Sequence, residues 1–336
     1  MGEAFISKRR HIGIMVETVK GTINTNPGPP VVEAWTDADF AIIAYDIQAT
    51  TQFGRFDRDT QKAYLSKLPG IVGTTAAQIS FTCEVRHSAN LTTLDVWERA
   101  LQACGFVLSG STIQPTSNGD EQKTVSIQVA LGAFGSGSNE AVLFTAKGCA
   151  GTVTFEGRVG QPLLARFTFT GVYAGVTTGT LRVPTQETGI PGIFQGVSAT
   201  WGGASRVLST INLDVGNSVV LRESVNASSG LLHAVITDRR PTGSIDPDLE
   251  LVATEDFYGQ LQNNTTKALA FVVNTTNATS ISGDTTRDLT FTLGDCRVTN
   301  VNDANRNGIQ VAGIDFEIVD TSDSSTPDGD ITIVIS

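Results

Sequence analysis

Histidines and glycine-rich turns are the residues of this chain that could carry chemistry, and their spacing argues against an active site. The three histidines, His11, His87 and His233, form no close pair with an acid, as a metal site or a general base requires. The segment 132–137 is rich in glycine but lacks the Lys-Ser/Thr pair of a phosphate-binding loop. The turn 303–308 loosely resembles an oxygen-ligand loop, but its Asn-Gly pair is typical of a plain hairpin. The sequence therefore predicts no catalytic, cofactor-binding or metal-binding residues.

Composition favours a structural β protein. The chain has 336 residues, of which 17% are charged and 40% hydrophobic, a balance typical of all-β architecture with many turns. Its net charge of −11 argues against tight binding to phosphates but allows a surface past which DNA can slide. No apolar run approaches membrane-spanning length, and residues 1–19 lack the apolar stretch of a secretory signal. The four scattered cysteines are expected to be small buried hydrophobes in a reduced compartment.

The sequence repeats itself once. The matched residues are Asp46 with Asn212 and Ile79 with Ile245, each 166 residues apart, then Cys149 with Cys296 and Phe169 with Phe316, each 147 apart. The offset is constant within each group of matched residues and decreases from the first group to the second. This pattern predicts one fold copied once, with shorter connections in the second copy. We therefore expect an N-terminal arm (1–35), a first repeat (36–178), a linker rich in Gly and Pro (179–192) and a second repeat (193–336).

Each repeat predicts a strand, a long loop, a second strand, a short helix and further strands. In the first repeat, Ile43, Tyr45 and Ile47 alternate with polar residues, the loop covers 51–75, and a helix over 94–103 is capped by Thr92 or Thr93. In the second repeat the loop covers 216–242, and Thr254 caps a helix that ends at Leu261. One helix per repeat cannot supply βαβ crossovers. The predicted fold class is therefore all-β with one short helix per repeat, in two tandem domains that resemble a sandwich or barrel.

Two sets of residues point towards a function. On the strands that flank the long loops, polar residues alternate with the expected core residues Ile47, Phe81, Val85, Leu213, Ile245 and Leu249. These polar residues are Asp46, Gln48, Ser80, Thr82 and Glu84 in the first repeat and Asn212, Asp214, Asp246, Asp248 and Glu250 in the second. A solvated sheet face is the ordinary explanation, yet facing carboxylates cost energy unless they serve a purpose. The second set is apolar residues within the long loops: Phe53, Phe56, Tyr64, Leu65, Val219, Leu221, Leu231 and Leu232. Loops of this kind are commonly functional, disordered or interface-forming.

Several segments carry a family resemblance. They are 103–106 (ACGF), 147–155 and 162–171 in the first repeat, and 212–217, 236–245 and 253–258 in the second. Together they resemble the major tail-tube proteins of long-tailed, non-contractile bacteriophages, in the two-repeat form, from about Arg9 to the C-terminus. The proline of Asp246-Pro-Asp248 departs from this pattern and implies an edge strand or a bulge.

The resemblance implies a structural virion protein without cofactors or enzymatic activity. Three chains with two repeats each would form a pseudo-hexameric ring, and rings would stack into the tail tube through which DNA is delivered. The polar residues above would face the lumen and give it a negative wall, while the apolar loop residues would contact the next ring. Implied partners are further copies of the chain, the tape-measure protein, the tail terminator and double-stranded DNA that passes without specific binding, with no membrane. The protein would be assembled in the host bacterial cytoplasm.

Other classes remain open at this point. A tail-terminator or baseplate ring protein could share the repeated unit. A pilus, surface-layer or adhesin module would be favoured by a secretion signal and disulfides, and the sequence shows neither. A polysaccharide-active enzyme needs an acid pair lined with aromatic residues, and only three tryptophans are present.

Overall fold

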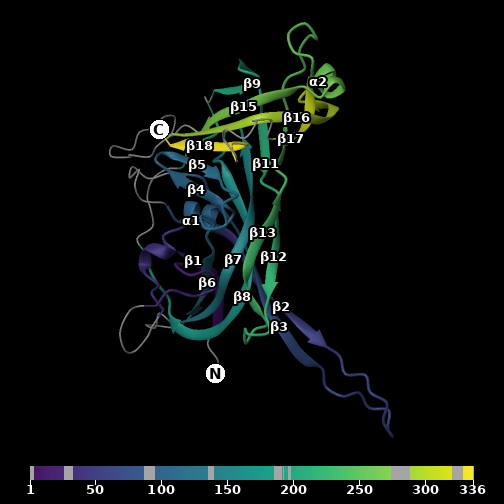
Figure 1. The fold of residues 1–336 in the computed structure, drawn as a ribbon. Helices are drawn as coiled ribbons and strands as arrows, with labels where there is room; N and C mark the ends of the chain where they lie inside the picture. The colour runs from purple at the N-terminus through teal and green to yellow at the C-terminus, as the bar shows by residue number, and fades with distance from the viewer. Residues whose placement is uncertain are drawn as a thin grey trace.

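The protein is built almost entirely of antiparallel β-strands (Figure 1). The computed structural model describes residues 4–25, 33–86, 95–134, 140–184, 191, 193–195, 198–273, 288–319 and 328–335. Within these residues there are two α-helices, and the strands form one 16-stranded sheet system and a separate two-stranded ribbon. The predicted all-β class with one short helix per repeat is confirmed.

The first half of the chain supplies eight strands and one α-helix. They are β1 (Ala4–Val16), β2 (Ala44–Phe56), β3 (Ile71–Glu84), α1 (Val96–Gln102), β4 (Phe106–Ser109), β5 (Thr112–Pro115), β6 (Val125–Phe134), β7 (Glu140–Arg158) and β8 (Leu164–Thr180), with a short 3-10 helix at Asp37–Phe40. Asp95 caps α1 in a capping box with Glu98. Of the expected caps, Thr92 and Thr93 lie outside the described residues. Gly105 follows the helix with a φ of 85°, a left-handed conformation that glycine adopts at little cost.

The second half supplies ten strands and one α-helix. Its elements are β9 (Ala199–Trp201), β10 (Ala204–Ser205), β11 (Thr210–Asp214), β12 (Asn217–Glu223), β13 (Leu231–Arg239), β14 (Thr242–Ile245), α2 (Phe257–Asn263), β15 (Thr266–Val273), β16 (Leu289–Arg306), β17 (Ile309–Ile318) and β18 (Ile331–Ile335). The cap of α2 is Asp256, whose carboxylate accepts a hydrogen bond from the Gly259 amide, and not the expected Thr254.

The two halves show the same pairing order and share one sheet. In the first half, β7, β8, β3 and β2 lie side by side in that order, and in the second half β16, β17, β14 and β11 do the same. The halves join where β11 pairs with the end of β7, so that Thr210–Asp214 lie opposite Arg158 to Thr154. We call this pairing the internal seam. A smaller joint forms where β18 pairs with β5.

Both segments expected to be long loops belong to β-hairpins. Residues 51–75 continue β2 and β3, and residues 216–242 contain the β12–β13 ribbon. The two hairpins have one register. The matching pairs are Gln48–Ser80 with Asn212–Ser244, Phe53–Thr75 with Asn217–Arg239, Arg55–Val72 with Val219–Ile236, and Phe56–Ile71 with Val220–Val235. Each of these residues in the second hairpin lies 164 positions after its counterpart in the first. Both hairpins also carry a register shift at the same place. The expected offset of 166 was wrong by two residues, a slip that leaves each side chain on the same face.

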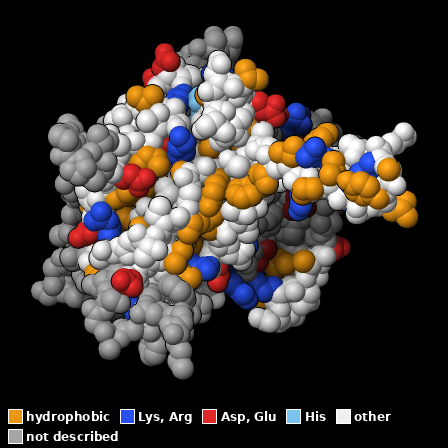
Figure 2. All heavy atoms as spheres, turned by 90° about the horizontal axis from the view of Figure 1, so that it is seen from below, with side chains coloured by type: hydrophobic (Ala, Val, Ile, Leu, Met, Phe, Trp, Pro, Cys, Tyr) orange, Lys and Arg blue, Asp and Glu red, His pale blue; other side chains and the backbone are white. Residues whose placement is uncertain are grey.

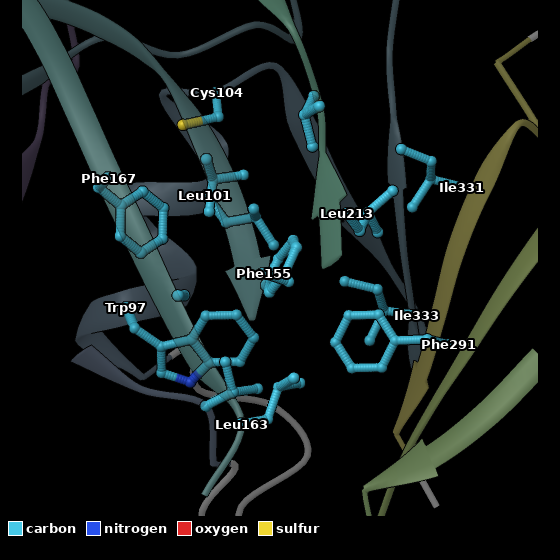
Figure 3. Close-up of a cluster of buried hydrophobic side chains, with 14 of the residues drawn as sticks. Trp97, Leu101, Cys104, Phe155, Leu163, Phe167, Leu213, Phe291, Ile331 and Ile333 are labelled. Atoms are coloured by element: carbon cyan, nitrogen blue, oxygen red, sulfur yellow. The ribbon is translucent and has the colours of Figure 1, made fainter. Parts of the chain in front are cut away.

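A continuous hydrophobic core runs through both halves. Phe155 on β7 and Phe291 on β16 are fully buried, with ring centroids 5.3 Å apart. Leu213 of the second half and Trp97 of the first belong to the same cluster (Figure 3). All four cysteines are buried with free thiols, as expected, and burial raises the pKa of the Cys296 thiol to about 12. The halves therefore share their packing.

Two expectations about strand faces are wrong. In β2, Tyr45 pairs with Thr82 and Gln48 pairs with Ser80, so Asp46 and Ile47 form a bulge, with Asp46 at a φ of 51°. The bulge turns Tyr45 out of the core, and it is 44% exposed.

The second error concerns the strand expected over 245–251. Pairing beyond Ile245 shrinks to a single bridge at Asp248, and Leu249 is 41% exposed instead of buried. Pro247 lacks the amide proton that a continuing ladder needs.

Candidate assembly surface

Most of the polar residues singled out in the sequence lie on one face of the sheet. Directly paired strand residues share a face, and one such row crosses both halves through successive partners. From β3 to β16 this row contains Thr82, Arg166, Thr154, Asp214, Thr242, Glu317 and Arg297. Parallel rows contain Gln48 with Ser80, and Glu84 in line with Asn212. We call this surface the polar face. It is continuous across the internal seam.

The β2 end of the polar face is more covered than alternation predicts. Thr82 is buried between its partners Tyr45 and Arg166. The phenol of Tyr45 donates a 2.5 Å hydrogen bond to the Glu84 carboxylate. That bond to the carboxylate, together with partial burial, raises the pKa of Tyr45 to about 12. Glu84 is therefore engaged by a neighbour and is not a free carboxylate.

The polar face carries positive as well as negative charge. Arg166 lies 3.8 Å from Glu156, and Arg297 forms an ion pair with Glu317. The expectation of a negative wall did not include these arginines. Arg166 could have been found from the sequence, because it alternates with the buried Ala165 and Phe167. The resulting surface is polar and mixed in charge.

The acidic residues 246–250 form a structural ion-pair network. Asp246 accepts hydrogen bonds from the Ser209 and Thr210 amides at 2.8 and 2.7 Å, and it also contacts Arg306. Partial burial raises the pKa of Asp246, but the bonds from Ser209 and Thr210 outweigh it and hold the pKa below its usual value.

The other two carboxylates of this segment are also occupied. Asp248 pairs with Arg306, and Glu250 pairs with Arg206, whose side chain is only 7% exposed. Asp246, Asp248 and Glu250 therefore all form ion pairs with arginines of the same chain. They are not the unpaired negative charges that the sequence suggested.

The apolar residues of the two hairpins have different surroundings. Residues 51–75, which we call the arm, project from the body of the molecule (Figure 1). In the arm, Phe53, Phe56, Tyr64 and Leu65 are all exposed. Seen from below, the arm shows hydrophobic and basic side chains together (Figure 2).

The second hairpin lies against the body of its own chain. Leu231 is buried with Ala76 and Val172, and Leu221 packs against them. Val219 and Leu232 are half-buried. The tip is anchored by the Thr75 amide, which donates a 3.2 Å hydrogen bond to the Ser229 carbonyl.

Two of the strand edges left unpaired within the described part of the chain lie at the ends of the two matching four-strand series. One is the outer edge of β2, the last strand of the sheet order. The other is the edge of residues 301–306 in β16 that faces away from β17. These strands are the equivalents of β11 and β7, which pair with each other at the internal seam. Unpaired edges expose backbone donors and acceptors that invite another strand.

Among the described residues, none of the helices is long and apolar enough to cross a membrane. The same residues contain no group of three or more His, Cys, Asp or Glu side chains placed to hold a metal ion.

Comparison with known proteins agrees with the all-β fold. No curated protein matches the chain. A family model does match, and it covers residues 7–333, nearly the whole chain, under the description "Phage tail tube protein". The chain belongs to the phage tail tube protein family.

Proposed function

We propose that three copies of this chain close into a ring and that stacked rings form the tail tube through which DNA passes. In each ring, β2 of one copy adds to residues 301–306 of β16 in the next copy. The internal seam is the observation that carries this proposal, because β11 and β7 already make the same junction inside the chain. An edge strand that has a built partner elsewhere in the same fold has a defined place for a second copy.

The pairings predict the register of this junction. Gln48 corresponds to Asn212, since each lies opposite a serine, Ser80 or Ser244. On the other side, Val153 of β7 lies opposite Phe167 and Val301 of β16 lies opposite Ile314. Val153 and Val301 therefore occupy equivalent positions. The residues three positions after them, Glu156 and Ala304, are equivalent too.

Asn212 faces Glu156 at the internal seam. In the ring, Gln48 of one copy therefore faces Ala304 of the next.

Making all junctions alike doubles the apparent symmetry of the ring, and the number of three copies is taken from the family resemblance. Each chain contributes two four-stranded sets, β7–β8–β3–β2 and β16–β17–β14–β11, joined by one internal seam. If the junction between chains copies this seam, three chains present six near-equivalent units around one axis. A closed cyclic assembly leaves neither the β2 edge nor the β16 edge exposed.

The polar face supplies the wall of the channel. It is continuous across the seam and would continue across each junction between copies, since the register is the same. The net charge of −11 favours repulsion of phosphates, and two arginines of this face, Arg166 and Arg297, are each paired with an acid. By family resemblance, the tape-measure protein and the tail terminator are the further partners.

A disulfide between copies tests the ring. The variant Gln48→Cys/Ala304→Cys places two thiols directly opposite each other across the proposed junction, within the reach of a disulfide. The native cysteines are buried and do not interfere. After assembly and oxidation, a non-reducing denaturing gel should show covalent trimers. The single variants and the slipped pair Gln48→Cys/Asn302→Cys should remain monomeric.

Covalent species that extend beyond three chains would contradict the trimeric ring, and monomers alone would contradict the pairing of β2 with β16. Negative-stain microscopy of the same sample separates a tube protein from a tail terminator or baseplate ring. Stacked tubes are expected here, and isolated single rings would favour the alternative.

A further inference from the structure

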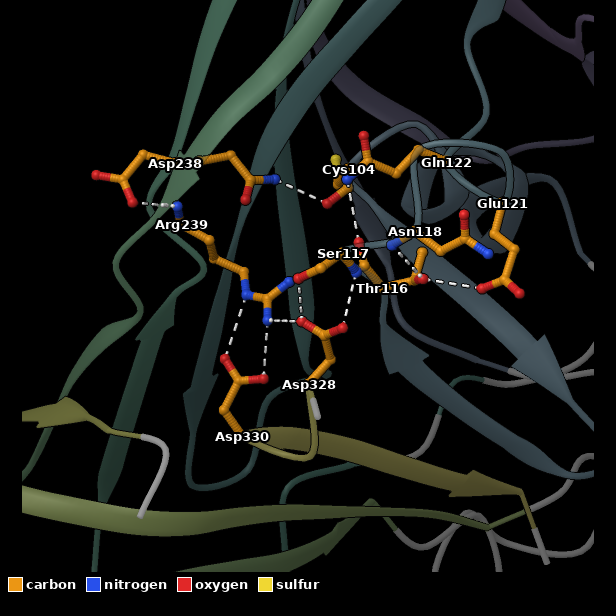
Figure 4. Close-up of polar contacts among 11 residues, drawn as sticks. Cys104, Thr116, Ser117, Asn118, Glu121, Gln122, Asp238, Arg239, Asp328 and Asp330 are labelled. Atoms are coloured by element: carbon orange, nitrogen blue, oxygen red, sulfur yellow. Dashed lines mark hydrogen bonds and ion pairs between the residues drawn. The ribbon is translucent and has the colours of Figure 1, made fainter. Parts of the chain in front are cut away.

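An open cavity lies beside the end of β13 in the second half. Its walls include residues 236–239, Pro241 and Ile318, together with Ser117, Asp328 and Asp330. Arg239 holds the floor of this cavity, because its guanidinium bonds to Asp328 and Asp330 at 3.0 Å (Figure 4). Asp328 also accepts bonds from the amide and hydroxyl of Ser117. Hydrogen bonds and ion pairs within the chain therefore hold this wall of the cavity together.

The equivalent place in the first half is filled by the chain itself. With the 164-residue correspondence, residues 236–239 match 72–75. The tip of the second hairpin contacts Thr74 and Thr75. The Ser229 carbonyl accepts a hydrogen bond from the Thr75 amide, and Gly230 lies against Thr74. Leu231 completes the contact by packing on Ala76 and Val172.

The segment that should fill the cavity is identified by the same correspondence. Ser229, Gly230 and Leu231 match Leu65, Ser66 and Lys67 at the tip of the arm. In the isolated chain this tip makes no such contact, since Leu65 is fully exposed and Lys67 is 60% exposed. The arm and the second hairpin have equal length, because 32 residues separate Gln48 from Ser80 and Asn212 from Ser244. The arm therefore reaches as far along a neighbour as the second hairpin reaches along its own chain.

The charges of the two surfaces suit each other. On the arm, Asp57 and Lys67 form an exposed ion pair at 3.1 Å, where the second hairpin has Leu221 and Leu231. At the cavity, Asp238 and Arg240 form an exposed ion pair at 2.8 Å, where the first half has Thr74 and Ala76. Where the contact within the chain is apolar, the arm and the cavity each present one exposed ion pair of their own, and on docking the cation of each pair can approach the acid of the other. A four-charge network favours one docking geometry more than an isolated surface pair does.

We propose that the tip of the arm, residues 65–67, docks in this cavity of the adjacent copy in the same ring. The inference rests on the proposed ring, in which β2 and the arm of one copy meet β16 and β17 of the next. Docking gives each junction a second contact beyond the strand pair. In this proposal the arm connects copies within one ring. The sequence had suggested instead that the arm contacts the next ring.

A second disulfide tests the docking. A Cβ built on Gly230 would lie 3.8 Å from the Thr74 Cβ, a normal separation for a disulfide. The equivalent pair between copies is Ser66→Cys with Asp238→Cys, both at exposed positions. Assembled tubes of this double variant, once oxidised, should give covalent trimers on a non-reducing denaturing gel. The matched control, Ser66→Cys with Ser218→Cys, moves the second thiol to the paired strand and should give none.

The outcomes separate docking from ring formation. Trimers from both disulfide pairs, 48/304 and 66/238, support both proposals. Trimers from 48/304 together with monomers from 66/238 overturn the docking and leave the ring intact. A 66/238 ladder that extends beyond three chains shows that the arm reaches the next ring, which also overturns docking within a ring. Monomers from both pairs mean that the proposed ring itself is wrong.

Discussion

The guanidinium of Arg10 donates a 2.6 Å hydrogen bond to the carbonyl of Ile47. Ile47 lies in the bulge of the edge strand β2, and its counterpart Ile211 is paired with Gly157 at the internal seam. Arg10 follows a register shift in β1, which carries it towards this edge. In the isolated chain, Arg10 thus occupies a backbone acceptor that the proposed junction between copies would use. Charged side chains placed on an edge strand are a known way to prevent unwanted pairing.

Replacing Arg10 should make assembly easier. In Arg10→Ala, the Ile47 carbonyl is free to accept from the next copy, so no existing bond has to be given up. A hydrogen bond of this kind contributes about 1 kcal/mol, or roughly a fivefold change in an association constant. Light scattering should show a shorter lag and a lower critical concentration than the wild type, while Lys8→Ala, an exposed neighbour, should leave both unchanged. Unchanged or slower assembly of Arg10→Ala with an intact fold would remove the guarding role.

The Asp246 carboxylate should stabilise the fold in a pH-dependent way. Its pKa is held below the usual value of 3.8 because bonds from Ser209 and Thr210 outweigh partial burial. A depressed folded pKa means that the contribution is present at neutral pH and is lost as the pH falls through that pKa. Asp246→Asn should therefore lower the free energy of unfolding at pH 7 by about 1–3 kcal/mol, and the difference from the wild type should shrink below pH 3.8. Urea unfolding of the wild type and Asp246→Asn at pH 7 and below pH 3.8 provides the check. A difference in the free energy of unfolding that is equal at both pH values would contradict this account.

Sequence patterns predicted the fold class but not the register. Both helices were predicted from a capping residue placed before an apolar stretch, although the caps proved to be Asp95 for α1 and Asp256 for α2. Alternation failed at Asp46, because a bulge changes the count without leaving a mark in the sequence. It failed again at Leu249, where Pro247 ended the strand that alternation alone continued. A pattern of period two describes a strand only while pairing continues.

The assembly surface was only partly visible in the sequence. The duplication identified which strands are equivalent, but the free edges of β2 and β16 follow from knowing that β11 pairs with β7. The ion pairs of Asp248 and Glu250 join segments distant along the chain, so local charge patterns could not reveal them. The hairpins were read as loops because their apolar residues mix with charged ones. That mixture of side chains is compatible with the proposed docking of the arm, which is exposed in the isolated chain.

Removing the aromatic contact between halves should destabilise the whole chain at once. Phe155 is fully buried against Phe291 across the two halves, so Phe155→Ala should cost about 3–5 kcal/mol through the cavity it leaves. Because the halves share a sheet and a core, calorimetry should show one transition at lower temperature. Phe56→Ala, at a position 68% exposed, should change stability by less than about 0.5 kcal/mol. Two separate transitions in the wild type would show that the repeats are independent domains.

Charge on the polar face should control the passage of DNA without affecting assembly. Glu156 and Asp315 are exposed on this face, one in each half, and neither belongs to the network around Arg306. Glu156→Lys with Asp315→Lys adds cations to the proposed channel wall, where phosphates can bind them. Tubes should form normally under the microscope, since these side chains point away from the core.

Particles carrying this double variant should release DNA more slowly than those carrying Glu156→Gln with Asp315→Asn, which removes charge without reversing it. The difference should grow at low salt, because the screening length rises from about 10 Å at 0.1 M to about 30 Å at 0.01 M. Release at the wild-type rate in low salt would show that these residues do not line the channel. Slow release that does not respond to salt would indicate a steric obstacle in place of phosphate binding.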